Sequence, residues 1–313
     1  MIRGIHHLTL MVRNLEAEVR FFEAAAGLHC LPSNAAGALA LSCSEAGGSA
    51  ARRASALLAG PNGYLLLVEA GPAAVGSETA NPINRAGIRH FCIQNHDCAL
   101  LDAGVHRGGG SLIAPPLDLG TGNQYAYARD PEANIMEIEG LPYAPAGEPT
   151  WLAHVAIVTR DMDRACTFYE GLFEAPLKRR AHVGPGVHFD RMGGLSDAKL
   201  EGAWLPAGNL QLELWQFHHP ESPAEPQPRR LYDPGYSMMS LETDSLEHDA
   251  ARLVGIGGTR AGTMSENEHV RALVCADPEG NLIELVEFTA TGLEWALAAR
   301  PEPGLVARIE AGR

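Results

Sequence analysis

The chain has 313 residues, of which 46% are apolar and 20% charged, so it has the composition of a globular protein with a substantial core, and its length predicts roughly two domains. Its formal net charge of −14 argues against a nucleic-acid partner, because a polyanion is bound by a basic surface. The six cysteines form no C-x-x-C pair, and the sequence has neither a signal-peptide pattern nor an apolar run near the ~20 residues of a membrane span, which together predict a cytoplasmic protein.

Four units, each a strand, a helix and further strands, follow one another along the chain. The first starts with a strand at 2–12, rich in β-branched and aliphatic residues. Asn14 can cap a helix at 15–26, in which apolar residues recur at helical spacing on one face. An Ala/Gly/Ser-rich stretch up to residue 60 predicts short strands, and a further strand follows at 64–69.

The second unit opens with a strand at 88–93 and continues with a helix at 99–105. A Pro/Gly-rich loop at 115–122 separates this helix from two paired strands, at 124–128 and 134–139. The unit therefore has the same order of elements as the first.

The third unit repeats the opening of the first. A strand at 151–159 precedes a helix at 162–173 that Asp161 can cap, and a strand at 209–217 leads into a proline-rich surface loop or lid at 218–235. The remaining predicted elements are strands at 236–243, 269–276 and 281–288, a helix at 246–254 and a helical stretch at 292–300.

One short stretch occurs twice. Asp130-Pro131-Glu132-Ala133-Asn134 recurs 147 residues later as Asp277-Pro278-Glu279-Gly280-Asn281, and the same offset separates His7 from His154 and Glu137 from Glu284. A register kept over the whole chain indicates an internal duplication. We therefore predict a first domain at 1–142 with units 1–70 and 86–140, a linker at 143–150, a second domain at 151–289 with units 151–217 and 235–289, and a C-terminal helix and tail at 290–313.

The openings of the two halves carry a family resemblance. His7-Leu8-Thr9-Leu10-Met11-Val12 stands before Phe21-Phe22, His154-Val155-Ala156-Ile157-Val158 stands before Phe168-Tyr169, and an Asp-Pro-Glu-x-Asn strand closes each half. Over residues 1–288 this pattern resembles the vicinal-oxygen-chelate superfamily, which includes glyoxalase I, extradiol ring-cleaving dioxygenases, methylmalonyl-CoA epimerase, and fosfomycin and bleomycin resistance proteins. The resemblance implies an α+β fold in which four βαβββ units form two curved, mixed-sheet half-barrel domains.

In that superfamily the metal ligands come from the first and last strand of each unit. The corresponding pairs in this chain are His7 and Leu66, His90 and Glu137, His154 and Glu213, and Met238 and Glu284. Leu66 and Met238 depart from the pattern, because neither side chain ligates a hard divalent metal.

Which units pair decides the expected site. If neighbouring units pair, the resemblance implies a triad of His7, His90 and Glu137, a two-histidine, one-carboxylate set that suits non-haem Fe(II). If the second unit pairs with the third, it implies a glyoxalase-type set of His90, Glu137, His154 and Glu213. His90 and Glu137 belong to both sets, although a strand histidine is more often simply packed and a strand glutamate more often faces solvent.

Tyr127 is the catalytic candidate, because it resembles the tyrosine that orients the substrate oxygen in ring-cleaving dioxygenases, although an aromatic strand residue can equally pack on its neighbours. Those enzymes also use an acid/base histidine between the two ligand histidines, and this chain has none between Cys43 and Arg89. The other histidines considered for this role are His96, His182, His188, His218 and His219.

The leading functional expectation is an Fe(II) ring-cleaving dioxygenase that uses O2 on an aromatic diol or hydroquinone, as in the degradation of aromatic compounds. The first alternative is a glyoxalase- or epimerase-type isomerase or lyase, in which a divalent metal stabilises an enediolate. Mn(II), Ni(II), Co(II) and Zn(II) are the other metals that such a site takes. The second alternative is a metal-free, small-molecule (drug) binding protein. Each reading implies a small-molecule partner, aromatic or bearing vicinal oxygens, and each is compatible with a homo-oligomer.

Overall fold

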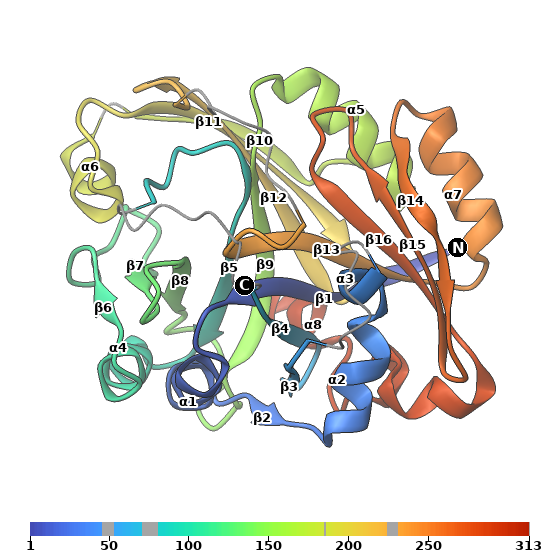
Figure 1. Cartoon of the computed structure of the whole chain (residues 1–313). Coiled ribbons are helices and arrows are strands. Elements are labelled where there is room, and N and C mark those ends of the chain that lie inside the picture. The colour runs from blue at the N-terminus through green and yellow to red at the C-terminus, as the bar shows by residue number, and fades with distance from the viewer. Residues whose placement is uncertain (46–52, 71–80, 185, 224–230, 313) are drawn as a thin grey trace.

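The computed structural model describes residues 1–45, 53–70, 81–184, 186–223 and 231–312, and these form two eight-stranded mixed sheets with helices packed around them (Figure 1). Neither sheet closes into a barrel. No helix among the described residues is long and apolar enough to span a membrane.

The first sheet combines the first and fourth units. In spatial order its strands are β14 (Thr259–Glu266), β15 (Val270–Ala276), β16 (Leu282–Phe288), β13 (Gly235–Thr243), β1 (Ile2–Val12), β4 (Tyr64–Glu69), β3 (Ser55–Ala59) and β2 (His29–Cys30). The units join where β1 pairs antiparallel with β13, and each of these two strands has a parallel partner on its other side, β4 or β16.

The second sheet combines the second and third units in the same way. Its strands are β10 (Arg179–Val183), β11 (Lys199–Ala207), β12 (Leu210–His219), β9 (Trp151–Val158), β5 (Gly87–Asn95), β8 (Ile135–Gly140), β7 (Gln124–Arg129) and β6 (Ser111–Leu112). Here β5 pairs antiparallel with β9, with β8 and β12 parallel on either side.

This pairing corrects the leading expectation, in which neighbouring units share a sheet. The division into 1–142 and 151–289 follows the repeat along the chain, whereas the sheets cut across it, because each sheet takes one unit from each half. The repeat could not decide this, since both pairings use the same strands in the same internal register.

Helices, in contrast, join neighbouring units. α1 (Leu15–Ala26) lies beside α4 (Cys98–Arg107), and a Cβ at Gly104 would come 2.6 Å from the Ala24 carbonyl oxygen, so only glycine permits this approach (Figure 1). α5 (Met162–Phe173) is joined to α7 (Leu246–Gly255) by Arg252, which donates to the carbonyls of Gly171 and Leu172 at 2.9 and 2.7 Å. Each half is therefore tied together by its helices, while each sheet crosses between the halves.

The caps predicted for two helices are present. The Asn14 side chain accepts from the Ala17 amide and the Asp161 side chain from the Arg164 amide, and Gly27 ends α1 in the left-handed conformation that favours glycine.

The short strands expected before residue 60 are present as β2 and β3, but two helices between them were not predicted. They are α2 (Ser33–Leu39) and α3 (Leu41–Glu45), and α2 forms because alanine is a strong helix former and its alanines are buried against the first sheet. The predicted helix at 292–300 consists of two 3₁₀ segments, η1 (Ala290–Trp295) and η2 (Leu297–Ala299). A regular helix, α8 (Leu305–Ala311), follows where the sequence pattern had faded, and α6 (Val187–Gly193) completes the helices of the described residues.

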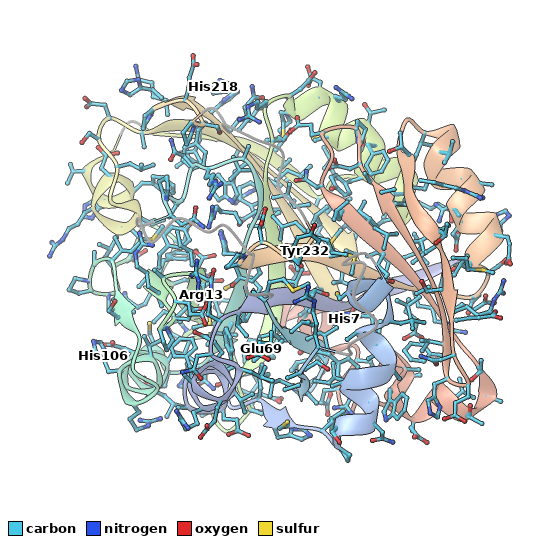
Figure 2. The ribbon with its side chains drawn as sticks, viewed as in Figure 1. His7, Arg13, Glu69, His106, His218 and Tyr232 are labelled. Atoms are coloured by element: carbon cyan, nitrogen blue, oxygen red, sulfur yellow. The ribbon has the colours of Figure 1, made fainter. Side chains whose placement is uncertain are left out.

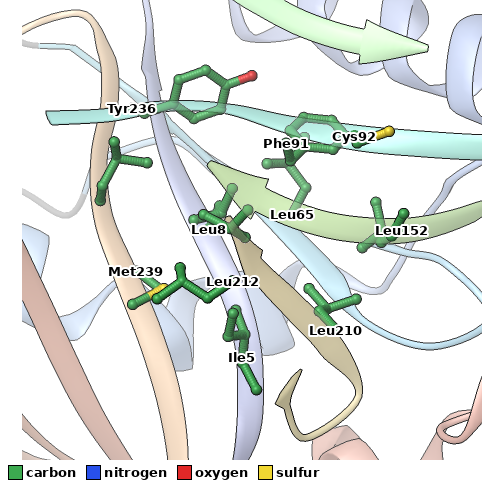
Figure 3. Close-up of a cluster of buried hydrophobic side chains, with 14 of the residues drawn as sticks. Ile5, Leu8, Leu65, Phe91, Cys92, Leu152, Leu210, Leu212, Tyr236 and Met239 are labelled. Atoms are coloured by element: carbon green, nitrogen blue, oxygen red, sulfur yellow. The ribbon is translucent and has the colours of Figure 1, made fainter. Parts of the chain in front are cut away.

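One face of each sheet contributes to a single shared core. Apolar side chains from β1, β4, β5, β9, β12 and β13 meet there, as Figure 3 shows for ten labelled residues. The opposite face of each sheet has its own smaller apolar cluster, around Met11 and Leu66 in the first sheet and around Tyr127 and Trp215 in the second. Strand alternation places the candidate ligands on these opposite faces, away from the shared core.

Candidate metal centre

Four side chains able to ligate a metal meet on the second sheet, on the face opposite the shared core. Adjacent strands supply them in the order Glu213 from β12, His154 from β9, His90 from β5 and Glu137 from β8. Their exposed fractions are only 4, 8, 1 and 6%, and one ligand atom from each lies within 4.8 Å of the other three. The two central strands thus provide the histidines and the two flanking strands provide the carboxylates.

The distances between these atoms fit a shared cation. His154 Nε2 lies 2.9 Å from Glu137 Oε2 and 3.2 Å from Glu213 Oε2, and His90 Nε2 lies 3.5 and 3.7 Å from the same two oxygens. Nitrogen and oxygen ligands about 2.0–2.2 Å from a divalent ion lie about 3–3.5 Å from one another. The residues present therefore match the spacing that a divalent ion requires.

Buried polar atoms without hydrogen-bond partners also indicate a bound metal. The Nε2 atoms of His90 and His154 and Oε2 of Glu213 are buried and make no hydrogen bond of acceptable geometry, even where a charged partner is within ion-pair distance. Buried polar atoms are rarely left without a partner, and several that converge on one point indicate a ligand that binds them together.

The site also provides the negative charge that binding of a cation requires. Burial alone would raise the pKa of Glu137, but the close imidazoles of His154 and His90 outweigh it and lower this pKa to about 2. Burial likewise opposes ionisation of His154, but the carboxylates of Glu213 and Glu137 raise its pKa well above the usual range. The Glu137 carboxylate thus faces the His154 imidazole, whose proton a metal would replace.

Trp204 holds Glu213 in position, and the sequence did not predict this contact. Its indole Nε1–H donates to Oε1 of Glu213 at 2.6 Å from the directly opposite position on β11. The neighbouring Gly202 makes room for the ring, because a Cβ there would lie 2.7 Å from the indole, and the Arg179 guanidinium stacks over the ring at 4.1 Å. The sequence does contain a signal for this contact. A two-residue Gly208-Asn209 turn joins β11 to β12, and a hairpin with that turn pairs Trp204 with Glu213.

Tyr127 lies next to the cluster. It stands directly across from Glu137 on β7, and its ring packs edge-on against His90 with 5.2 Å between ring centroids. Burial, followed by the charge of Glu137, raises the pKa of the Tyr127 hydroxyl well above its usual range, so this side chain stays a neutral hydrogen-bond donor.

His7 is not part of this centre, which corrects the triad of His7, His90 and Glu137. It lies in the first sheet, where its Nε2 is 3.7 Å from Oε2 of Glu284, the other ligand position left to that sheet. Ser42 and Ser240 donate to the two oxygens of Glu284 at 2.5 and 2.7 Å, so that the carboxyl group is satisfied without a metal.

The side chains of His6 and His7 are hydrogen-bonded, although the alternation of a regular strand would point neighbouring residues to opposite faces. A bulge in the pairing of β1 with β13 between Ile5 and His7 breaks the alternation and brings their Nδ1 atoms to 2.7 Å. The Trp295 carbonyl, 2.8 Å from His6 Nε2, can only accept, so His6 carries its proton on Nε2 and accepts from His7 Nδ1–H. The Nε2 of His7 is therefore a bare acceptor that faces Glu284.

The five histidines considered for acid/base chemistry lie elsewhere. The four ligand side chains are buried, whereas these histidines are partly or fully exposed: His96, His182, His188, His218 and His219. The expected second-sphere histidine is therefore not among them.

Comparison with known proteins agrees with this architecture. Residues 151–285 match the model of the Glyoxalase/Bleomycin resistance protein/Dioxygenase superfamily. The matched residues span the third unit and most of the fourth. A search of curated proteins found no match.

Solved structures with a similar fold cover nearly the whole chain. Glyoxalase I from Zea mays is 17% identical, with a TM-score of 0.65 over 95% of this chain and 96% of that one. A variant of that enzyme gives 18% identity and a TM-score of 0.66 over 94% and 95% of the two chains. A Bacillus subtilis protein named as a candidate dioxygenase is 10% identical, with a TM-score of 0.58 over 100% of this chain and 96% of that one. At these identities the likeness establishes the fold and leaves the reaction open.

Proposed function

We propose that this protein is a divalent-metal enzyme of the glyoxalase or epimerase type, which moves a proton next to a carbonyl group in a small substrate with two vicinal oxygens. The observation that carries the proposal is the convergence of His90, Glu137, His154 and Glu213 in one buried cluster. When bound, the metal would supply Lewis-acid stabilisation to the negative charge that develops on the substrate oxygens.

The chain's own residues divide the remaining work. The indole N–H of Trp204 donates to Oε1 of Glu213, so we propose that Glu213 stays bound to the metal as a fixed ligand. Glu137 lies within reach of both imidazoles, and we assign to its carboxylate, as the ligand that would leave the ion when substrate binds, the acceptance and return of the substrate proton. Phe189, Trp215 and Phe217 form an apolar wall on this face of the sheet, which limits the access of water to the carboxylates.

A solvent-exchange experiment tests this reaction class. Protein reconstituted in turn with Ni(II), Co(II) and Zn(II) is incubated in D2O with a panel of α-hydroxycarbonyl and hemithioacetal compounds. We expect deuterium to appear at the carbon between the two oxygens, and Glu137→Gln to reduce the exchange by more than about a hundredfold, the scale of a lost general base. Bound metal without exchange on any compound of the panel would count against the proposal.

Ring cleavage by a dioxygenase is the second candidate, and Tyr127 is the observation that favours it. This tyrosine stands against His90 and opposite Glu137, where it could orient a phenolic oxygen. Two histidines and one carboxylate of the same cluster would then hold Fe(II). Anaerobic loading with Fe(II), followed by oxygen uptake with catechols and hydroquinones, distinguishes this candidate from the first. Tight ligand binding by a protein that takes up no metal would instead favour a binding protein.

A further inference from the structure

We propose that His182, Glu201 and His218 form a second metal-binding site, for a divalent transition-metal ion such as Zn²⁺, on the opposite face of the second sheet from the central cluster. One ligand atom from each of the three side chains lies within 4.8 Å of the other two. We call these three residues the outer site. Figure 2 shows His218 at the margin of the molecule, consistent with a site open to solvent.

The strand register brings the three side chains to one face. His182 on β10 is directly opposite Glu201 on β11, so that the two side chains project on the same side of the sheet. Leu200 on β11 pairs with Phe217 on β12, and the preceding Lys199 pairs with His219. His218 lies between these two pairs on β12 and is therefore the extra residue of a bulge. Such bulges re-aim a side chain, and His218, next to the inward-facing Phe217, points to the side of Glu201.

The carboxylate of the outer site is already oriented and ionised. The Arg180 Nε–H donates to Oε1 of Glu201, and the same guanidinium also binds Asp163 on α5. The hydrogen bond from Arg180 holds the pKa of Glu201 below its usual range, so the group is a carboxylate at neutral pH. Both histidines are exposed, so an ion can reach their ring nitrogens directly from solvent.

The ligand set selects the kind of ion. Two imidazoles and one carboxylate suit Zn²⁺, Co²⁺, Ni²⁺ or Cu²⁺, whereas Mg²⁺ and Ca²⁺ prefer sites made of oxygen alone. An ion bound there would link the edge strand β10 to the end of β12, where the chain enters the proline-rich loop. The outer site would therefore fasten the sheet edge as well as bind the ion.

Titration with Zn²⁺ alone, with the metal-free full-length protein in a calorimeter, tests the proposal. We expect the double variant His182→Ala, His218→Ala to bind one equivalent fewer than the wild type, or to bind it more than about tenfold more weakly, because two of three ligands are gone. The matched control is His106→Ala, an exposed histidine on α4 beside Asp102, which should bind as many equivalents as the wild type. Equal binding by the wild type and the double variant would overturn the proposal.

This readout is a difference between two proteins, so it does not depend on whether the central cluster binds metal or on its reaction. Thermal unfolding gives a second measurement, because an ion that binds only the folded protein raises its Tm. Zn²⁺ should raise the Tm of the wild type by more than that of the double variant. The same rise in both proteins would contradict an ion at the outer site.

Discussion

The indole of Trp204 shows how one side chain outside the ligand set can govern the centre. Its N–H satisfies Oε1 of Glu213 and leaves Oε2, which has no hydrogen bond, facing the histidines. Groups that hydrogen-bond a ligand typically contribute 10–100-fold to metal affinity, because they fix its orientation before the metal arrives (on the order of 1.4–2.7 kcal/mol).

The variant Trp204→Phe tests this role. We expect it to fold, because phenylalanine keeps most of the apolar ring, but to bind divalent metal at the central cluster about tenfold more weakly. Trp151→Phe is a matched control, since the indole of Trp151 donates to Gln94 on the same sheet but not to a ligand. The measurement is metal affinity by competition with a chromophoric chelator, and equal affinities for the two variants would contradict the role of Trp204.

The buried Glu284 gives a prediction on pH. Burial raises its pKa to about 7, against the opposing hydrogen bonds from Ser42 and Ser240. Because the folded-state pKa is raised, the stability linked to this carboxyl group is fully present below the ordinary glutamate pKa of 4.5 and is lost as the pH rises through about 7. A shift of this size corresponds to roughly 3 kcal/mol at most.

We therefore expect Glu284→Gln, whose amide cannot ionise, to gain stability relative to the wild type as the pH rises from 5 to 8. Urea denaturation at both pH values gives the free energy of unfolding. The control is Glu16→Gln, because the side chain of Glu16 is 82% exposed on α1. If the difference between Glu284→Gln and the wild type is the same at both pH values, Glu284 does not titrate in this range.

At the scale of elements, the repeated Asp-Pro-Glu-x-Asn stretch acts as a clasp between neighbouring units. The carboxylate of Glu132, from the turn before β8, accepts from the backbone amides of Arg13 and Asn14 at 2.6 and 2.7 Å, where α1 begins. In the second half, Glu279 accepts from the amides of Arg160 and Asp161 at 3.0 and 3.1 Å, where α5 begins. The turn with Glu132 belongs to the second sheet and holds α1, which follows β1 of the first sheet. The turn with Glu279 belongs to the first sheet and holds α5, which follows β9 of the second sheet.

Removing one of these carboxylates should loosen that connection. We expect Glu132→Ala to lower the free energy of unfolding by about 1.5–3 kcal/mol, the usual contribution of hydrogen bonds to a charged group. Glu294→Ala, an exposed glutamate in η1, is the control that should change little. Thermal and urea unfolding measure both variants, and an unchanged Glu132→Ala would show that α1 does not need the clasp.

At the scale of the whole molecule, the two halves of the chain share each sheet, so the central cluster is built from both halves. His90 and Glu137 come from the first half, and His154 and Glu213 from the second. Helices and clasps join the units that are neighbours in sequence, while the strands join units across the duplication. The cluster therefore depends on correct docking of the halves, and this docking is stabilised by the shared apolar core.

Metal analysis of two histidine variants tests this arrangement. We expect His154→Ala to lose the metal of the central cluster, with at least about tenfold weaker binding, whereas His7→Ala should keep it, because His7 lies in the other sheet. The metal content of purified protein after dialysis measures both. Loss of metal in His7→Ala but not in His154→Ala would favour the neighbour pairing instead.

That His90 and Glu137 are present in either candidate site is what the resemblance to the superfamily implies. The order of residues alone was enough to establish the four units and the offset that relates the two halves. These features depend on local periodicity and internal register, which the order of residues records directly. It also placed Tyr127 on the strand beside Glu137, because the two strands are joined by a short turn.

The tertiary structure was needed to show that His154 and Glu213, rather than His7, complete the cluster. Alternation tells which face a side chain takes, but the choice of the next strand depends on hydrogen bonds and core packing between segments far apart in sequence. The same limit applies to the contact between Trp204 and Glu213, the bulge that turns His6 toward His7, and the meeting of His182 and His218 at Glu201. Each depends on the register between strands, and single strands do not encode that register.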